Sequence, residues 1–153
     1  MTDSYLHPKD RWFDDYEVGD SYHSERTYVM REQRMIQFAE EFDPQAFHTD
    51  PEAATESVFG GLIASGWHTT AAMMSLIAEN VGEASMGAVG IDELRWPSPV
   101  RPGDELRLTA TVVEMRPSTS KPDRGIIRMQ QQLHNQRDEL VFSCIALMMF
   151  RRR

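Results

Sequence analysis

Residues 62–79 constrain the fold most strongly, because this segment has the pattern of a helix that is apolar on nearly every side. Trp67, Ala71 and Met74 recur at intervals of three to four residues, which is the period of an α-helix. Most positions between them are also small or apolar, so the helix has almost no face that favours water. Its 18 residues would form a rod of roughly 27 Å. Such a helix must be enclosed, and a β-sheet is the obvious enclosure.

Segments that favour β-strands follow this helix at residues 88–96, 106–112, 126–134 and 140–150. In the second segment, Leu106 and Leu108 alternate with Arg107 and Thr109, which predicts one buried face and one mixed face. The last segment is apolar on both faces. That pattern favours a central position in the sheet or a buried contact between subunits.

The chain before the central helix is predicted to add a strand at residues 21–30 and a short amphipathic helix at residues 31–42. Residues 1–20 show neither period, and we expect them to form an N-terminal arm that packs through Trp12, Phe13 and Tyr16. No internal repeat or low-complexity linker divides the chain. We therefore predict a single α+β domain over residues 1–153, with an antiparallel sheet wrapped around one long helix.

The charge balance argues against a general nucleic-acid binder. The chain has 16 Lys and Arg residues against 24 Asp and Glu residues, which gives a net charge of −8. Cys144 lies in an apolar run, so we expect a buried thiol that suits a reducing cytoplasm rather than a disulfide. The first residues are polar and acidic, and the longest apolar run falls short of the roughly 20 residues that span a bilayer, so neither an export signal nor a membrane span is expected.

The proline-marked stretch from residue 42 to residue 51 contains the candidate chemistry. Asp43 and His48 lie five positions apart, and Pro44 places Asp43 at or just past the end of the preceding helix. A carboxylate and an imidazole at this spacing can together activate a water molecule. The alternative is that Asp43 only turns the chain and His48 only bonds to backbone. Asp50 is better explained as the N-cap of a helical turn that begins at Pro51.

Residues 42–54 and 59–69 resemble the hydratase motif of the MaoC-like dehydratases, the family that contains the (R)-specific enoyl-CoA hydratases. The similarity extends to residues 100–104 and 135–137, so it covers nearly the whole chain. The resemblance implies a hotdog fold whose subunits pair into a homodimer. It also implies the addition of water to a trans-2-enoyl-CoA to give a (3R)-3-hydroxyacyl-CoA, or the reverse dehydration, with acyl-CoA as substrate and no other cofactor.

The resemblance assigns roles to individual residues. Asp43 and His48 match the catalytic Asp and His of the motif with their spacing kept. The thioester oxygen would be bound by backbone N–H groups at the start of the long helix, around Ser65, Gly66 and Trp67. Further candidates are Phe47 and Met74 for the acyl pocket and Arg124 for the coenzyme A phosphates.

Two positions depart from the family pattern, in which the motif usually reads Asp, any residue, Asn, Pro, any residue, His. Here Gln45 replaces the Asn, and the proline is at Pro44. A helix Ser that supports the Asp in many hydratases aligns with Met74. These departures leave three functions open: a hydratase, a hotdog thioesterase that directs water at the carbonyl, or a subunit that binds acyl thioesters without turnover.

Other chemistry is not indicated by the sequence. The five histidines show no metal-ligand spacing, and His68 is expected to be a packed, hydrogen-bonded residue of the long helix. No glycine-rich loop has the pattern that binds phosphates or dinucleotides. We therefore expect neither a metal nor a nicotinamide or flavin cofactor.

Overall fold

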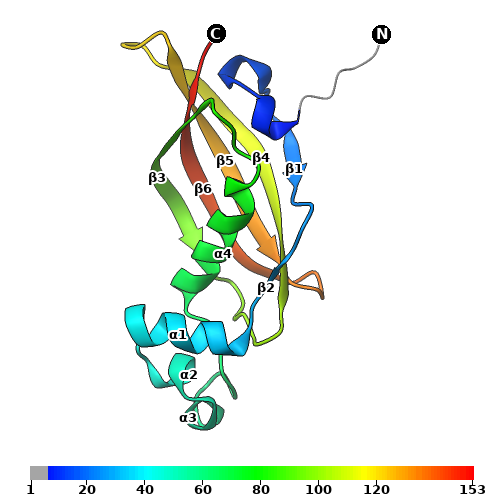
Figure 1. Cartoon of the computed structure of the whole chain (residues 1–153), viewed down its shortest axis with the longest axis vertical. Helices are drawn as coiled ribbons and strands as arrows, with labels where there is room; N and C mark the ends of the chain where they lie inside the picture. Colours follow the sequence, from blue (N-terminus) through cyan, green and yellow to red (C-terminus); the bar gives the residue numbers. More distant parts are fainter. Residues whose placement is uncertain (1–6) are drawn as a thin grey trace.

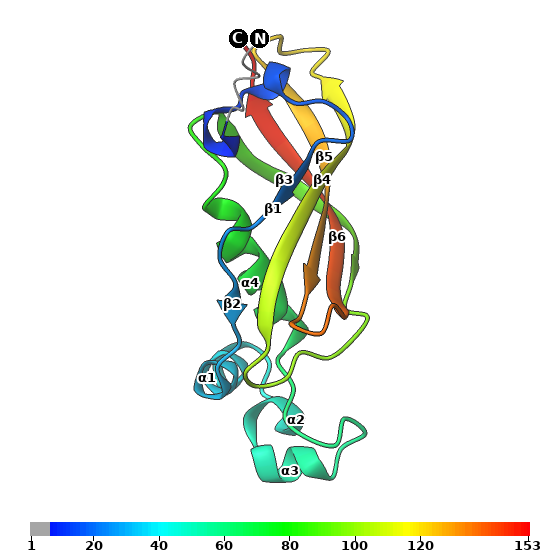
Figure 2. The same ribbon diagram turned by 90° about the vertical axis from the view of Figure 1, so that its right-hand side faces the viewer.

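The computed structural model describes residues 7–153, and in this part of the chain a curved antiparallel sheet lies along one helix, α4 (Figures 1 and 2). The strand order is β1-β4-β5-β6-β3, and β2 also pairs with β4. The strands are β1 (Ser21–His23), β2 (Tyr28–Val29), β3 (Ser85–Arg95), β4 (Glu105–Pro117), β5 (Arg124–His134) and β6 (Leu140–Arg151). The predicted α+β class and the hotdog arrangement are confirmed.

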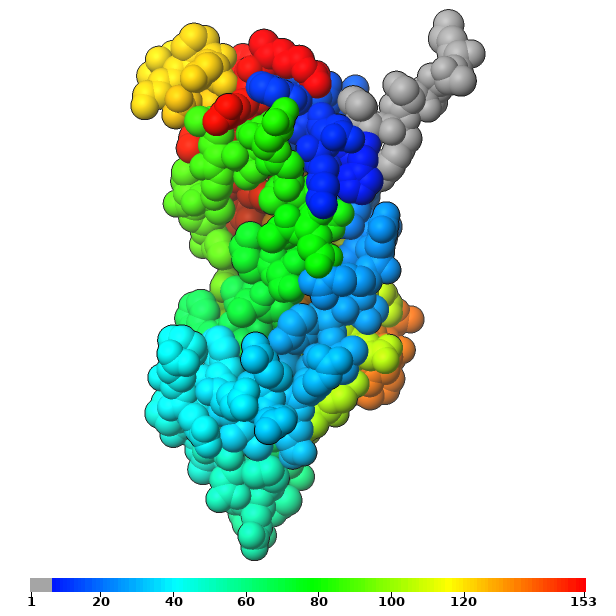
Figure 3. All heavy atoms as spheres, in the orientation of Figure 1, coloured from blue at the N-terminus to red at the C-terminus, as the bar shows by residue number. Residues whose placement is uncertain are grey.

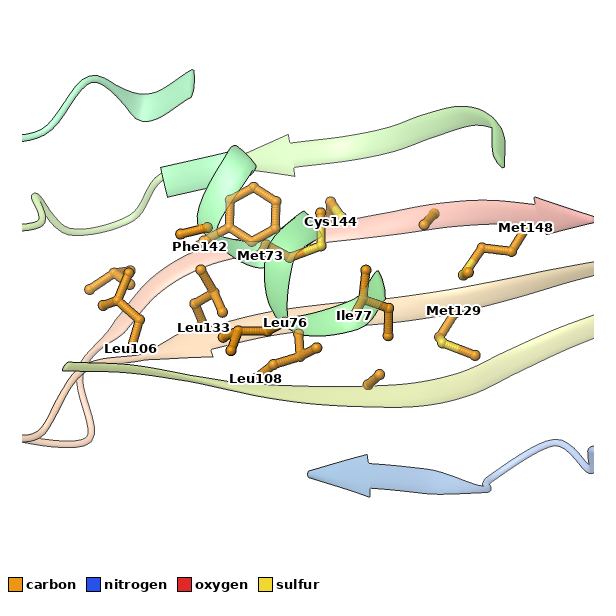
Figure 4. Close-up of a cluster of buried hydrophobic side chains, with 14 of the residues drawn as sticks. Met73, Leu76, Ile77, Leu106, Leu108, Met129, Leu133, Phe142, Cys144 and Met148 are labelled. Atoms are coloured by element: carbon orange, nitrogen blue, oxygen red, sulfur yellow. The ribbon is translucent and has the colours of Figure 1, made fainter. Parts of the chain in front are cut away.

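The core lies between α4 (Gly66–Ala78) and the concave face of the sheet. Figure 4 shows Leu76 and Ile77 of α4 on the side of Leu108 of β4 and Leu133 of β5, with Met73 beside Cys144 of β6. These side chains are all buried. Burial of each such side chain contributes about 1.5–3 kcal/mol, so this layer is a main source of stability. Cys144 also lies in it, as expected, and burial raises the pKa of its thiol to about 11.

The central helix is shorter than the sequence suggested. It begins at Gly66 rather than near residue 62 and has 13 residues. Residues 62–64 are buried but run as irregular backbone, where the Ile63 N–H donates to the Phe47 carbonyl and the Ala64 N–H to the Val100 carbonyl. Burial without helical structure explains why apolar composition alone placed the helix start too early.

The N-terminal strand and the strand after α4 also differ from the expectation. The predicted strand at residues 21–30 is divided into β1 and β2. The Ser24 N–H still donates to the Leu108 carbonyl, whereas Glu25 and Arg26 lie exposed between the two strands. Arg26 instead reaches α4, donating to Ser75 Oγ at 2.8 Å. Strand β3 begins at Ser85, three residues earlier than predicted, and is irregularly paired with β6.

Three helices form the tapered end of the molecule opposite the C-terminus (Figures 1 and 3). They are α1 (Glu32–Phe42), α2 (Ala46–Thr49) and α3 (Pro51–Thr55). The Asp50 side chain accepts from the Glu52 and Ala53 N–H groups, so its predicted capping role is confirmed. The loop expected around His48 contains a helical turn, α2, which starts where the Gln45 carbonyl accepts from the His48 and Thr49 N–H groups.

The N-terminal arm packs as predicted, apart from residues 1–6, which lie outside the described part. Short 3₁₀ turns cover Pro8–Asp10 and Phe13–Asp15. Phe13 and Tyr16 are buried, and the Tyr16 ring packs 5.3 Å from that of Phe150 on β6. A Cβ added at Gly125 would come within 2.4 Å of Phe13, so glycine is needed there for the arm to dock on β5. In residues 7–153 we find no helix long and apolar enough to cross a membrane.

Candidate active site

The Asp43 carboxylate is held by three polar side chains. Asp43 is the C-cap of α1, and its N–H still donates to the Ala39 carbonyl at 2.8 Å. Its Oδ2 accepts from Ser65 Oγ at 2.8 Å and lies 3.2 Å from His48 Nε2. Its Oδ1 accepts from Gln45 Nε2 at 2.7 Å. The helix end and these contacts fix the direction of the carboxylate.

The protonation of His48 follows from its partners. The ring is buried, and its Nδ1 lies 2.8 Å from the Ile63 carbonyl oxygen. A carbonyl can only accept, so Nδ1 carries a proton. In the neutral tautomer that this bond selects, Nε2 is a hydrogen-bond acceptor 3.2 Å from Asp43 Oδ2. A water molecule that donates one hydrogen to each of these two acceptors would satisfy both.

Burial and hydrogen bonding have opposite effects on Asp43. Burial raises the pKa of the Asp43 carboxyl, but the hydrogen bonds from Gln45 and Ser65 and the nearby His48 together lower it below the ordinary value of 3.8. The Gln45 and Ser65 donors stabilise the charged form, and His48 adds to this when its ring is protonated. The carboxylate is thus ionised at neutral pH and can act as a base or orient a water molecule.

Asp43 and His48 face a cleft of about 570 Å³. Aromatic rings make up much of its lining: Phe42, Phe47, Phe59, Trp67 and Trp96. Residues 97–100 complete one wall. A cleft of this size, mainly apolar with a few convergent polar groups, suits a small organic ligand.

The first turn of α4 borders the same cleft and leaves one well-placed backbone donor. Ser65 is the N-cap, and its Oγ accepts from the Trp67 N–H at 3.3 Å. That contact occupies the Trp67 donor. The Ser65 and Gly66 N–H groups, in contrast, have no acceptor among the described residues, and of these two residues only Gly66 lines the cleft. Of the three predicted donors, Gly66 is therefore the best placed to bind a carbonyl oxygen.

The two distant motif segments fix the loop on the other side of the cleft. The Arg101 guanidinium donates to the Phe59 carbonyl at 2.7 Å. Buried Asp104 accepts from the Arg101 N–H at 2.8 Å and from Gln136 Nε2 at 2.9 Å. Residues 100–104 and 135–137 therefore act as a brace for the glycine-rich loop.

Two of the sequence candidates do not line the cleft in the described part of the chain. Met74 is 49% exposed on α4, and Arg124 pairs with Asp123 at the far end of β5. The family serine that supports the Asp aligns with Met74, but here the hydroxyl that donates to Asp43 comes from Ser65. Ser75, next to Met74, is bonded to Arg26 instead. His68 is packed and hydrogen-bonded as predicted, stacked on Phe38 with Nε2 3.1 Å from the Tyr28 hydroxyl.

Sequence reasoning missed three contributors to the site: the Gln45 amide, the Ser65 hydroxyl and the Trp96 ring. Ser65 had a usable signal, since a serine directly before an apolar helix is a typical N-cap. Gln45 was treated only as a departure from the motif. Trp96 lies far from the motif in the sequence and reaches the cleft through the sheet, so no local pattern identified it. Among residues 7–153, no group of three or more His, Cys, Asp or Glu side chains could hold a metal ion.

Known proteins share this architecture. A MaoC-like dehydratase from Rhodospirillum rubrum is 44% identical in sequence and superposes with a TM-score of 0.86 over 94% of this chain and 98% of that one. The R-hydratase PhaJ1 of Pseudomonas aeruginosa is 26% identical, with a TM-score of 0.76 over 93% of this chain and 86% of that one. A mesaconyl-CoA hydratase of Cereibacter sphaeroides is 29% identical over 94% of this chain, which spans 42% of that enzyme. The sequence profile of the MaoC like domain matches residues 15–131. The chain therefore belongs to the MaoC-like dehydratase family.

Proposed function

We propose that this protein catalyses the reversible hydration of a trans-2-enoyl-CoA to the (3R)-3-hydroxyacyl-CoA. One observation carries the proposal: the Asp43 carboxylate and His48 Nε2 lie 3.2 Å apart in an aromatic cleft that is also lined by Gly66, whose N–H has no acceptor among the described residues. The similarity to an R-hydratase and to a mesaconyl-CoA hydratase supports the same reaction type.

Asp43 and His48 would activate the attacking water. The water donates one hydrogen to Asp43 Oδ2 and the other to His48 Nε2, which turns an oxygen lone pair toward the substrate. As this oxygen bonds to C3 of the enoyl group, the pair of side chains takes up the proton that the water loses. A proton returned to C2 completes the addition, so the elements of one water molecule are divided between C3 and C2.

The Gly66 N–H would stabilise the charge that develops on the thioester oxygen. Attack at C3 moves electrons through the conjugated system onto that oxygen, which becomes an enolate. A fixed backbone donor at this point is worth about 3 kcal/mol in other enzymes. The N-terminus of α4 adds a favourable electrostatic potential.

We further propose that the active form is a homodimer. Strand β3 lies at one edge of the sheet and exposes Val89 and Ile91. The cleft residue Trp96 directly follows this strand in the chain. An exposed apolar edge strand is a ready surface for pairing with a second copy. Light scattering on a sizing column should give twice the 17.6 kDa chain mass, and a monomer would contradict this part of the proposal.

Asp43→Asn tests the reaction. The variant should fold normally but hydrate crotonyl-CoA at least about 100-fold more slowly, because the amide cannot accept the proton. Loss of absorbance of the conjugated thioester measures the rate. Asp50→Asn is a matched control, because asparagine caps a helix as well as aspartate does and Asp50 only caps α3.

Unchanged turnover in Asp43→Asn would refute the assignment. Release of free thiol instead of loss of conjugation would identify a thioesterase. Binding of crotonyl-CoA without either change would identify a non-catalytic acyl-thioester binder.

A further inference from the structure

Trp96 is attached to the start of α4 by a chain of hydrogen bonds. Its indole N–H donates to Thr70 Oγ1 at 3.3 Å. The Thr70 hydroxyl in turn donates to the Gly66 carbonyl at 3.0 Å. The ring is therefore fixed relative to the first residue of the helix, although it comes from the segment after β3.

The Trp96 ring also lies directly against Gly66. A Cβ added at Gly66 would come within 2.6 Å of Trp96 Cε2 and 2.7 Å of Cδ2, closer than real Cβ atoms approach other atoms. The absence of a side chain at position 66 thus allows the indole to pack there. The same glycine lines the cleft and carries an N–H with no acceptor among the described residues.

A second indole, that of Trp67, lies beside the Trp96 ring. Trp67 packs edge-on against Trp96, with ring centroids 5.2 Å apart and an interplanar angle of 79°. Both rings line the cleft, yet Trp67 is 58% and Trp96 41% exposed. Large aromatic surfaces left accessible inside a cleft are available to a ligand.

We infer that Trp96 is a specificity-determining residue that restricts substrates to enoyl thioesters without a branch at C2. The inference rests on the proposed function, in which the thioester oxygen accepts from the Gly66 N–H at about 2.9 Å. The C1 and C2 atoms of the acyl group then lie within reach of the indole. A hydrogen at C2 fits beside the ring, whereas a methyl group collides with it.

Two substrates that differ by one methyl group test this inference. Crotonyl-CoA has a hydrogen at C2, and tigloyl-CoA carries a methyl group there. The quantity to compare is the ratio of kcat/KM for tigloyl-CoA to that for crotonyl-CoA, measured in the wild type, Trp96→Phe, Trp96→Leu and Thr70→Val. General damage to the fold lowers both values and leaves this ratio unchanged.

Trp96→Leu should raise the ratio at least 10-fold, because pockets discriminate between substrates that differ by one carbon by about 10- to 200-fold. Trp96→Phe and Thr70→Val should raise it less, because a ring remains but loses its hydrogen-bonded position. Val113→Ala, an exposed apolar position on β4 outside the cleft, should not change it. A ratio that stays within threefold of the wild type in Trp96→Leu overturns the inference.

Saturated thioesters separate this inference from the proposed function, because they bind without being hydrated. Calorimetry with butanoyl-CoA and 2-methylbutanoyl-CoA should show that the wild type prefers the unbranched compound and that Trp96→Leu loses the preference. Binding without hydration of crotonyl-CoA would refute the proposed hydratase function, and the role of Trp96 would then be tested by this binding preference alone. A wild type that binds neither saturated thioester overturns the inference.

Discussion

Ser65 joins the catalytic carboxylate to the central helix, so its replacement should affect activity and stability separately. Its Oγ donates to Asp43 Oδ2 at 2.8 Å and accepts from the Trp67 N–H at 3.3 Å. The first bond orients the carboxylate, and the second caps α4. Two substitutions can distinguish these contributions, because glycine is a better N-cap than alanine.

The contribution of each contact to the free energy of unfolding can be estimated from its type. Hydrogen bonds to charged groups contribute about 1.5–3 kcal/mol, and the partly exposed Asp43 favours the lower limit. Loss of a serine cap costs about 1 kcal/mol in alanine variants and only a few tenths in glycine variants. We expect Ser65→Gly to lower the free energy of unfolding by about 2 kcal/mol and Ser65→Ala by about 2.5–3 kcal/mol.

Activity should fall equally in both variants. Each loses the donor that holds Asp43 Oδ2, and a misplaced catalytic group costs up to about 100-fold in rate. Loss of this donor also raises the pKa of the Asp43 carboxyl, since the Ser65 bond helps to lower it. The acid limb of the profile of kcat/KM against pH should therefore move to higher pH.

Urea unfolding at pH 7 and hydration of crotonyl-CoA between pH 4 and 8 measure the two effects. Ser65 is fully buried, so both variants must first be shown to fold by circular dichroism. A variant that loses stability but keeps the activity and pH profile of the wild type would refute the role of Ser65 in orienting Asp43. Asp50→Asn again serves as a capping control away from the cleft.

Three further predictions concern stability. Burial, with a smaller effect of Arg34, lowers the pKa of His68 from 6.5 to about 4. As the pH falls, the unfolded chain therefore takes up this proton before the folded chain does, and the free energy of unfolding should drop by up to about 3 kcal/mol between pH 6.5 and pH 4. Urea unfolding of His68→Phe should show a shallower pH dependence. Among the described residues, the buried Gln131 amide has only the sulfur atoms of Met148 and Cys144 as side-chain partners, so Gln131→Met should raise the free energy of unfolding by about 1 kcal/mol; destabilisation on thermal unfolding would contradict this. Asp104→Ala should cost about 2–4 kcal/mol in urea unfolding because it leaves the Arg101 N–H and the Gln136 amide without their acceptor, and a loss below about 0.5 kcal/mol would count against the brace.

Local patterns predicted the fold well wherever one periodicity dominated. The alternation from Leu106 and the apolar periodicity of α4 identified the sheet and the helix that it encloses. The prediction was less accurate where burial occurs without regular structure, as at Leu62 to Ala64. It was also less accurate in β1 and β2, between which Arg26 makes a long-range contact to α4.

The candidate site could be predicted only as far as one segment of chain contains it. Asp43 and His48 lie on the same short stretch, so their spacing identified them as a pair. Ser65 bonds to Asp43 from the start of α4, and Trp96 lines the cleft from the segment after β3. Their contacts depend on the packing of the sheet against the helix. No pattern within a sequence window specifies such contacts.

The departure at Gln45 changes which atoms support the carboxylate without leaving it unsupported. Gln45 occupies the position of the motif asparagine, and Pro44 lies between it and Asp43. The glutamine side chain donates to Asp43 Oδ1 at 2.7 Å, while Ser65 donates to Oδ2 from the helix start. Both oxygens thus have a donor, and the pKa of Asp43 is lowered accordingly. Because catalysis depends on the direction and charge of the carboxylate, and not on the residue type that supplies the donor, the altered motif remains compatible with hydration.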